Sequence, residues 1–99
     1  MKALVYDSVQ TLVYRDMPDP IVGAGQSLIR IEASGICGSD MHAFLGHDDR
    51  RPAPLILGHE AAGRIVGGLQ DGARVTINPL VSCGSCQACK SGRDNLCSE

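Results

Sequence analysis

Residues 28–42 have the sequence LIRIEASGICGSDMH, in which two different patterns follow one another. Polar and apolar residues alternate from Leu28 to Ala33, which is typical of an antiparallel strand with one buried face, here Ile29, Ile31 and Ala33. After the break at 34–38, Ser39 and Asp40 are residues that favour the start of a short helix. Gly46 favours its end just after Leu45. The stretch therefore predicts a strand that leads directly into a short helix.

The remaining apolar segments also indicate strands. Residues 1–6 and 11–14 predict a hairpin, and 61–66 and 73–77 predict two further strands bounded by glycine, asparagine and proline. Residues 47–54 are polar, charged and proline-bearing, and they predict an exposed loop in which His47 is solvated. We therefore expect a mainly β chain, a partial β-barrel or curled sheet with one short helix.

Composition excludes several classes of function. The chain has 99 residues, with 9 basic and 11 acidic side chains and a formal charge of −2. This balance offers no basic face for nucleic acid. The longest apolar runs have four residues, so we expect no membrane span and no export signal, and we expect a cytoplasmic protein. One Phe, two Tyr and no Trp leave few large core residues, so we expect a metal to reinforce the fold.

Four of the five cysteines lie in a cysteine-rich lobe, residues 82–98. They have the spacing C-x2-C-x2-C-x7-C: Cys83, Cys86, Cys89 and Cys97. Two-residue spacing lets neighbouring thiolates converge on one ion, and four thiolates around Zn²⁺ form a closed, structural site. An odd cysteine count without an export signal argues against a disulfide framework.

Two other functions are compatible with this lobe. An iron–sulfur electron carrier also uses C-x2-C-x2-C, but its fourth cysteine follows after three residues and precedes proline. Here the gap is seven residues and Ser98 follows. The second alternative is a non-catalytic zinc module that binds a partner, which predicts one metal per chain. Metal analysis distinguishes these possibilities.

A second group of candidate metal ligands lies outside the lobe. Cys37 follows the alternating strand, and His59-Glu60 follows a short apolar run between Gly58 and Gly63. A thiolate, an imidazole and a carboxylate form the mixed ligand set that a catalytic zinc accepts while one position stays open for water or substrate.

Three motifs together resemble a known family. They are Gly35-Ile36-Cys37-Gly38-Ser39-Asp40-x-His42, Gly58-His59-Glu60-x-x-Gly63 and the four lobe cysteines. In order and separation they resemble the N-terminal part of the zinc-dependent medium-chain alcohol dehydrogenases, whose catalytic domain is a GroES-like β-barrel. The resemblance covers residues 1–99 and implies a partial GroES-like barrel with a short helix and a zinc lobe.

The resemblance also implies roles for individual residues. Cys37 and His59 correspond to ligands of a catalytic zinc, and Glu60 corresponds to a nearby carboxylate that ligates or exchanges with water. Ser39 matches the hydroxyl that bonds the substrate oxygen, and His42 matches the end of its proton relay. Asp40 fits the partner of the His59 imidazole. The lobe cysteines match the ligands of a structural zinc: Cys83, Cys86, Cys89 and Cys97.

In the family, a nucleotide-binding domain lies beyond the segment that corresponds to Glu99. The nearest match to G-x-G-x-x-G here, at 23–28, leads into a strand and predicts a turn, so we expect no cofactor-binding residues in this chain. The resemblance implies that these residues are the N-terminal part of a catalytic domain and do not turn over substrate alone. The complete enzyme, a homodimer or homotetramer, is expected to oxidise an alcohol by Zn²⁺ activation and hydride transfer to NAD or NADP, with NAD favoured.

The substrate prediction rests on the same segment. Cys37-Gly38-Ser39-Asp40 is more similar to the polyol and threonine dehydrogenase branch than to the primary-alcohol branch. The chain also lacks bulky rings that would line a slot for long aliphatic chains. We therefore expect a small secondary alcohol or polyol as substrate.

Overall fold

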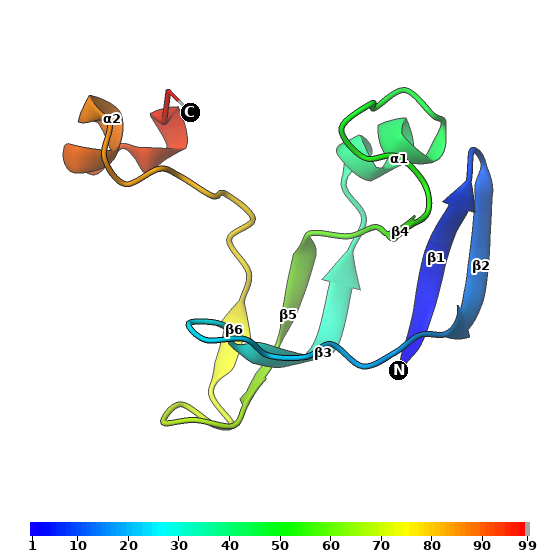
Figure 1. The fold of residues 1–99 in the computed structure, drawn as a ribbon, viewed down its shortest axis with the longest axis horizontal. Helices are drawn as coiled ribbons and strands as arrows, with labels where there is room; N and C mark the ends of the chain where they lie inside the picture. The colour runs from blue at the N-terminus through cyan, green and yellow to red at the C-terminus, as the bar shows by residue number, and fades with distance from the viewer. Residues whose placement is uncertain (99) are drawn as a thin grey trace.

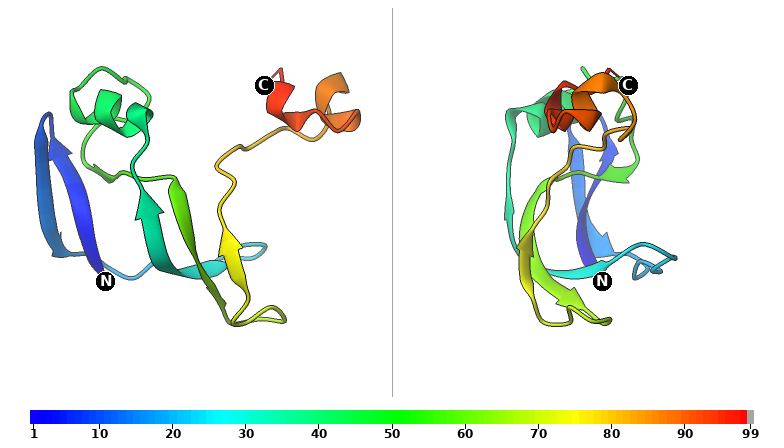
Figure 2. Two further views of the ribbon diagram at one scale, coloured as in Figure 1. Left: turned by 180° about the vertical axis from the view of Figure 1, so that it is seen from behind. Right: turned by 90° about the vertical axis from the view of Figure 1, so that its left-hand side faces the viewer.

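The computed structural model describes residues 1–98 and contains two open three-stranded sheets, a short helix and a separate cysteine lobe (Figure 1). One sheet has the strand order β2-β1-β4, formed by Lys2–Ser8 (β1), Thr11–Asp16 (β2) and Leu55–Ile56 (β4). The other has the order β3-β5-β6, formed by Leu28–Gly35 (β3), Glu60–Val66 (β5) and Arg74–Thr76 (β6). The mainly β prediction is confirmed, and the described strands do not close into a barrel (Figure 2).

The predicted N-terminal hairpin is present, and it carries most of the small core. β1 and β2 pair antiparallel with Val5 opposite Val13. Val5 and Tyr6 of β1 are 1% and 2% exposed, and Ala43 of the helix is 1% exposed. The hairpin turn is tied to the helix end, because the Gln10 N–H donates to the Phe44 carbonyl at 2.8 Å. The first sheet thus holds the helix in place.

The helix α1 (Gly38–Phe44) begins slightly earlier than the sequence suggests. Its N-cap is Cys37, because the Asp40 carboxylate accepts a hydrogen bond from the Cys37 backbone N–H at 3.1 Å. Ser39 therefore lies inside the first turn, and its predicted capping role is wrong. The predicted end is confirmed: Leu45 is the C-cap, and Gly46 follows with a φ of +82°.

β3 and β5 form a long antiparallel pair, and the register of this pair determines where the candidate site lies. Gly35 pairs with Glu60, Ile31 pairs with Gly63, and the register shifts between Ile31 and Ala33. A Cβ on Gly63 would lie 2.0 Å from the Arg30 carbonyl oxygen. The second glycine of Gly58-His59-Glu60-x-x-Gly63 is therefore a packing requirement, since only glycine lets the two backbones approach this closely.

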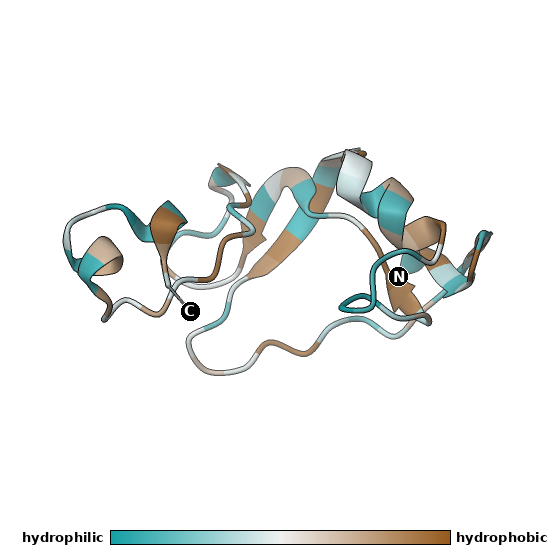
Figure 3. Cartoon of the chain, turned by 90° about the horizontal axis from the view of Figure 1, so that it is seen from above, coloured by the Kyte–Doolittle hydropathy of each residue, from teal (hydrophilic) through white to brown (hydrophobic). Residues whose placement is uncertain are grey.

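The predicted burial of one face of β3 is only partly correct. Ile29 is half-buried, but Ile31 is 50% exposed and Ala33 is exposed. Hydrophobic and hydrophilic segments alternate along the strands as the pattern requires (Figure 3). Within residues 1–98, β3 makes its main contacts with its neighbour β5, and the exposure of Ile31 shows that the described residues cover its face only in part. The alternation of polar and apolar residues therefore predicted which side chains share a face of β3, but it did not predict how deeply that face is buried.

The cysteine lobe lies at the end of an extended segment, away from both sheets (Figures 1 and 2). The sequence predicts no regular structure there, but the lobe contains a short helix α2 (Gln87–Lys90) and a 3-10 turn η1 (Asp94–Leu96). Neither element has a buried residue. Cys86 is the N-cap of α2, and its sulfur accepts a hydrogen bond from the Cys89 N–H. The pattern of apolar residues gives no sign of this local contact.

No helix within residues 1–98 is long and apolar enough to cross a membrane.

Candidate metal centres

The four lobe cysteines converge as their spacing predicts. One ligand atom from each lies within 4.8 Å of all the others. The Sγ atoms of Cys83 and Cys89 are 3.9 Å apart, and those of Cys86 and Cys97 are 4.0 Å apart. A tetrahedral zinc with Zn–S bonds of about 2.3 Å needs sulfurs about 3.8 Å apart. The sulfur arrangement therefore fits a zinc ion.

Backbone N–H groups point at these sulfurs and favour their ionised form. The Ser85 N–H donates to Cys83 Sγ at 3.4 Å, and hydrogen bonds led by this one lower the Cys83 pKa to about 7. The Cys89 N–H donates to Cys86 Sγ at 3.5 Å and is the main cause that lowers the Cys86 pKa to about 5. Burial raises the Cys89 pKa to about 11. Hydrogen bonding thus favours the thiolate forms of Cys83 and Cys86, the forms that ligate a metal.

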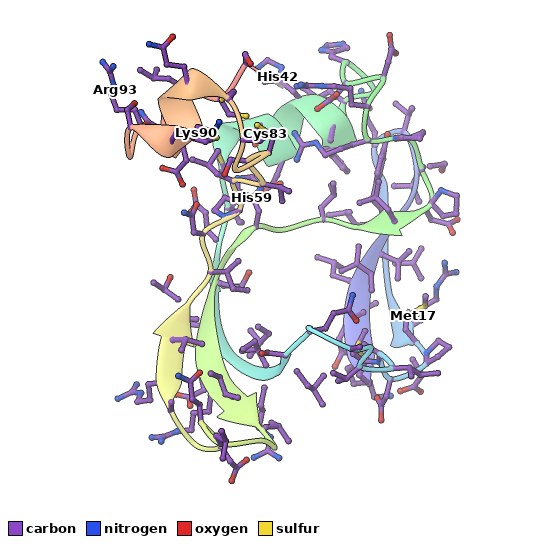
Figure 4. All side chains as sticks on the ribbon, turned by 60° about the vertical axis from the view of Figure 1, so that its left-hand side comes forward. Met17, His42, His59, Cys83, Lys90 and Arg93 are labelled. Atoms are coloured by element: carbon purple, nitrogen blue, oxygen red, sulfur yellow. The ribbon has the colours of Figure 1, made fainter. Side chains whose placement is uncertain are left out.

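The second cluster joins Cys37, His59 and Glu60. One ligand atom from each lies within 4.8 Å of the others, although the residues come from different elements. The strand register explains this arrangement. Because Gly35 pairs with Glu60 across β3 and β5, the residues just after β3 and just before β5 meet at one end of the sheet. His59 lies there, at the start of β5 and close to α1 (Figure 4).

Gly35 leaves space for the carboxylate of this cluster. A Cβ on Gly35 would lie 2.6 Å from Glu60 Oε2. The glycine before the cysteine in the motif therefore keeps the Glu60 carboxylate where the structure has it, within reach of Cys37 and His59. Glu60 is exposed while Cys37 and His59 are half-buried, so the cluster opens toward solvent on its carboxylate side.

Asp40 contacts both ligand-bearing segments. Its Oδ2 accepts the Cys37 backbone N–H at 3.1 Å, and its Oδ1 lies 3.5 Å from His59 Nδ1. With Nδ1 directed at a carboxylate, Nε2 is the nitrogen free to ligate a metal. The mixed sulfur, nitrogen and oxygen donor set fits zinc with an open position.

Ser39 and His42 lie three residues apart on α1, so they share one helix face. Ser39 is half-buried and His42 is exposed. Both line a surface hollow with residues 47–51 of the following loop. The structure thus joins Ser39 and His42 on one surface. Cys37, at the N-cap of the same helix, belongs to the metal cluster.

The sequence predicts an exposed loop at residues 47–54, but the loop in the structure is not uniformly exposed. The side chains of Asp48 and Arg51 are only 12% and 26% exposed. Arg51 forms an ion pair with Asp40 at 3.3 Å, and the Arg51 guanidinium holds the pKa of Asp48 below its ordinary value. Sequence reasoning missed both residues, because a half-buried ion pair and a solvated charged loop have the same amino-acid composition.

Two groups of candidate metal ligands, one of four cysteines and one mixed, thus lie on an open, mainly β scaffold, and both donor sets are ones that zinc accepts. Residues 23–99 match the alcohol dehydrogenase GroES-like domain, and the chain belongs to this family. The predicted resemblance and the GroES-like fold class are confirmed.

Curated relatives and a solved structure agree with this assignment. The chain is 41% identical to L-galactonate-5-dehydrogenase of Escherichia coli and 42% identical to sorbitol dehydrogenase of Bacillus subtilis. Each alignment covers 98% of this chain and 30% of the relative. A zinc-binding dehydrogenase of Sinorhizobium meliloti, solved with NADP, superimposes with a TM-score of 0.81 at 38% identity over 99% of this chain and 30% of that one. The chain spans about 30% of the length of these relatives.

Proposed function

We propose that residues 1–99 are the N-terminal part of the catalytic domain of a zinc-dependent dehydrogenase that oxidises a small secondary alcohol or polyol with NAD or NADP. The observation that carries this proposal is the cluster of Cys37, His59 and Glu60, whose ligand atoms lie within 4.8 Å of one another. The relatives support the oxidoreductase class, and the names of two of them, L-galactonate and sorbitol dehydrogenases, support a polyhydroxylated substrate.

Cys37 and His59 would hold a catalytic zinc, with Glu60 as a third ligand or an exchanging neighbour. The lobe would hold a structural zinc through its four thiolates: Cys83, Cys86, Cys89 and Cys97. When bound, the catalytic zinc supplies Lewis acidity to an alcohol oxygen, and the nicotinamide of the dinucleotide supplies the hydride acceptor. We place the nucleotide-binding domain outside these 99 residues.

The chain's own residues would bind and deprotonate the alcohol. The Ser39 hydroxyl can accept the substrate's hydroxyl proton while it donates its own onward. His42 lies on the same face of α1, one turn further along, and it borders the hollow that opens to solvent. Its exposed imidazole can therefore pass a proton from Ser39 to water, because an imidazole has one nitrogen that accepts a proton and another that donates one. Asp40 Oδ1, 3.5 Å from His59 Nδ1, would orient the His59 ring.

The first test is metal content of the complete enzyme purified without added metal. The proposal expects two zinc ions per chain. One zinc would instead indicate a non-catalytic zinc module, and iron with visible absorption would indicate an electron carrier. His59→Ala should lose one zinc and all alcohol oxidation while dinucleotide binding stays nearly intact, and His47→Ala should keep both zinc ions. Unchanged turnover in His59→Ala would remove this residue from the site.

The second test concerns the substrate. We expect higher kcat/KM for 2,3-butanediol, sorbitol or threonine than for ethanol, measured with NAD and with NADP. Ser39→Ala should lower kcat for the best substrate about tenfold or more, because a hydrogen bond worth about 1–1.5 kcal/mol and a proton path are lost. A clear preference for ethanol over every secondary alcohol would contradict the proposed substrate class.

We also propose a cytoplasmic homodimer or homotetramer. The support for this location is that all five cysteines lie in candidate metal-ligand groups, an arrangement expected where thiols stay reduced. Sedimentation of the complete enzyme tests the oligomeric state.

A further inference from the structure

We infer that Arg51 is a positioning residue for the Cys37–His59–Glu60 cluster and that it acts through Asp40. This inference rests on the proposed function, since it concerns how the metal ligands of that function are held. The observations that carry it are three contacts of one guanidinium and the unequal exposure of two adjacent arginines.

Arg51 lies in the loop between α1 and β4, and its guanidinium uses three nitrogens on three partners. Nε donates to Asp48 Oδ2 at 2.9 Å, Nη1 donates to Asp40 Oδ1 at 3.3 Å, and Nη2 donates to the Ser39 carbonyl. A rigid planar fork suits this arrangement, and a lysine ammonium does not reproduce it. The side chain of Arg50, its neighbour in sequence, is 92% exposed and forms an ion pair with Asp48 at the longer distance of 3.6 Å. The two arginines are chemically identical but have different environments.

Asp40 is the residue through which Arg51 reaches the cluster. Its side chain is 10% exposed, so its charge requires compensation by a cation or by hydrogen bonds. Oδ2 accepts the Cys37 N–H, and Oδ1 is shared between Arg51 Nη1 and His59 Nδ1. One carboxylate thus contacts segments that bear two candidate metal ligands. The guanidinium neutralises that carboxylate and fixes the position of Oδ1, which in turn orients the imidazole.

Losing this contact has a defined consequence. Without the guanidinium, Asp40 keeps its hydrogen bond from the Cys37 N–H, but its Oδ1 can turn away from His59 Nδ1. Partners of metal-bound histidines typically contribute 10–100-fold to metal affinity. Arg51 contacts Asp40 and not the imidazole itself, so we expect Arg51→Met to have an effect at the lower end of this range and to weaken zinc binding at the cluster about tenfold. The lobe zinc should be unaffected, because the lobe lies apart from α1 (Figure 1).

A purely structural role makes a different prediction. If Arg51 only fastens the loop to the helix, then removing Asp48, the loop's own partner for Arg51, should have the same effect. The positioning role expects Asp48→Asn to keep metal affinity close to the wild-type value, since the Arg51–Asp40 contact does not depend on the Asp48 charge.

The experiment uses the complete enzyme with cobalt or zinc in the cluster. The rate of zinc release to an excess of chelator reports how firmly the cluster holds its metal, and the visible spectrum of the cobalt form reports the geometry around the Cys37 thiolate. We expect Arg51→Met to release cluster zinc about tenfold faster and to alter the cobalt spectrum, with one lobe zinc retained. Arg51→Lys should be intermediate, and Arg50→Met should match the wild type in both readouts. The kcat of Arg51→Met should fall with little change in KM for the dinucleotide.

Three results would overturn the inference. One is a wild-type cobalt spectrum and wild-type zinc release in Arg51→Met. The second is an equal loss in Asp48→Asn, which would leave Arg51 as a loop fastener only. The third is a wild-type protein with no metal at Cys37, which would overturn the proposed function and the positioning role together. If Arg51→Met does not fold, Arg51→Lys and Asp48→Asn decide between the two roles.

Discussion

Gly63→Ala is the substitution for which the structure predicts the sharpest effect. Its added Cβ would lie 2.0 Å from the carbonyl oxygen of Arg30 and 3.0 Å from Ile29 Cγ2. The first neighbour is backbone in the paired strand, so it cannot turn aside as a side chain would. Ordinary contact begins near 3.4 Å, so β3 and β5 must separate by about 1.4 Å at this point (3.4 minus 2.0).

The cost follows from the hydrogen bonds between these strands. A separation of about 1.4 Å takes an N–H···O distance of about 2.9 Å well beyond hydrogen-bonding range. Each broken ladder bond loses about 0.5–1.5 kcal/mol, and each backbone group left buried and unpaired adds about 1–3 kcal/mol. The lower entropy of the unfolded alanine variant recovers about 0.4–1 kcal/mol. We therefore expect a net local destabilisation of about 3 kcal/mol.

Hydrogen exchange of the complete enzyme, followed by mass spectrometry on peptides from β3 and β5, measures this local opening free energy. The matched control is Gly38→Ala, because nothing lies within 4 Å of an added Cβ at this first-turn helix position. That variant should be neutral or more stable by up to about 1 kcal/mol. Because the register pairs Gly35 with Glu60, Gly63→Ala should also loosen zinc at the cluster and not at the lobe. Exchange in β3 and β5 within about 0.5 kcal/mol of wild type would refute this reasoning.

Three further predictions concern the thiols, the loop and the core. After removal of zinc by a chelator, iodoacetamide at pH 7 should modify Cys86 well before Cys89. The reason is that a pKa of about 5 makes Cys86 a thiolate at this pH, whereas a pKa of about 11 keeps Cys89 a thiol. Peptide mass spectrometry measures the order of labelling, and faster labelling of Cys89 would contradict the prediction. The lowered pKa of Asp48 means that its ion pair with Arg51 stabilises the loop above the ordinary aspartate pKa of about 4 and that this stability is lost as pH falls through the lowered value. Asp48→Asn should therefore remove that acid-dependent step in proteolysis of the loop, and an unchanged pH profile would argue against the pair. Val5→Ala should destabilise the β1–β2 hairpin by about 2–3 kcal/mol, because Val5 is 1% exposed, and a loss below about 0.5 kcal/mol in hydrogen exchange would show that the core is plastic there.

Local sequence was sufficient for the lobe and for the helix end. The lobe ligands lie within fifteen positions, and two-residue spacings hold thiolates together whatever the rest of the chain does. Gly46 ends α1 because it adopts a positive φ that side chains disfavour. The motifs around Cys37 and His59 identified the family, and the match over residues 23–99 confirms it.

Sequence was less informative where partners are distant along the chain. Alternation in β3 indicated which residues share a face, yet Ile31 is half-exposed, because burial depends on what packs above the strand. The helix α1 begins after Cys37, because the Asp40 carboxylate accepts a hydrogen bond from the Cys37 N–H. The sequence could not distinguish this start from a later one, because Ser39 is an equally suitable N-cap residue.

The sequence alone thus determined the identities of the candidate metal ligands, since ligand chemistry belongs to the side chain and short spacing constrains it locally. Only the tertiary structure decided that Cys37 meets His59, because the antiparallel register of β3 and β5 closes a 22-residue gap in sequence (59 minus 37). It also decided that Arg51, and not Arg50, contacts Asp40. Two adjacent arginines have the same charge and propensity, and the path of the loop over α1 buries one of them and leaves the other in solvent.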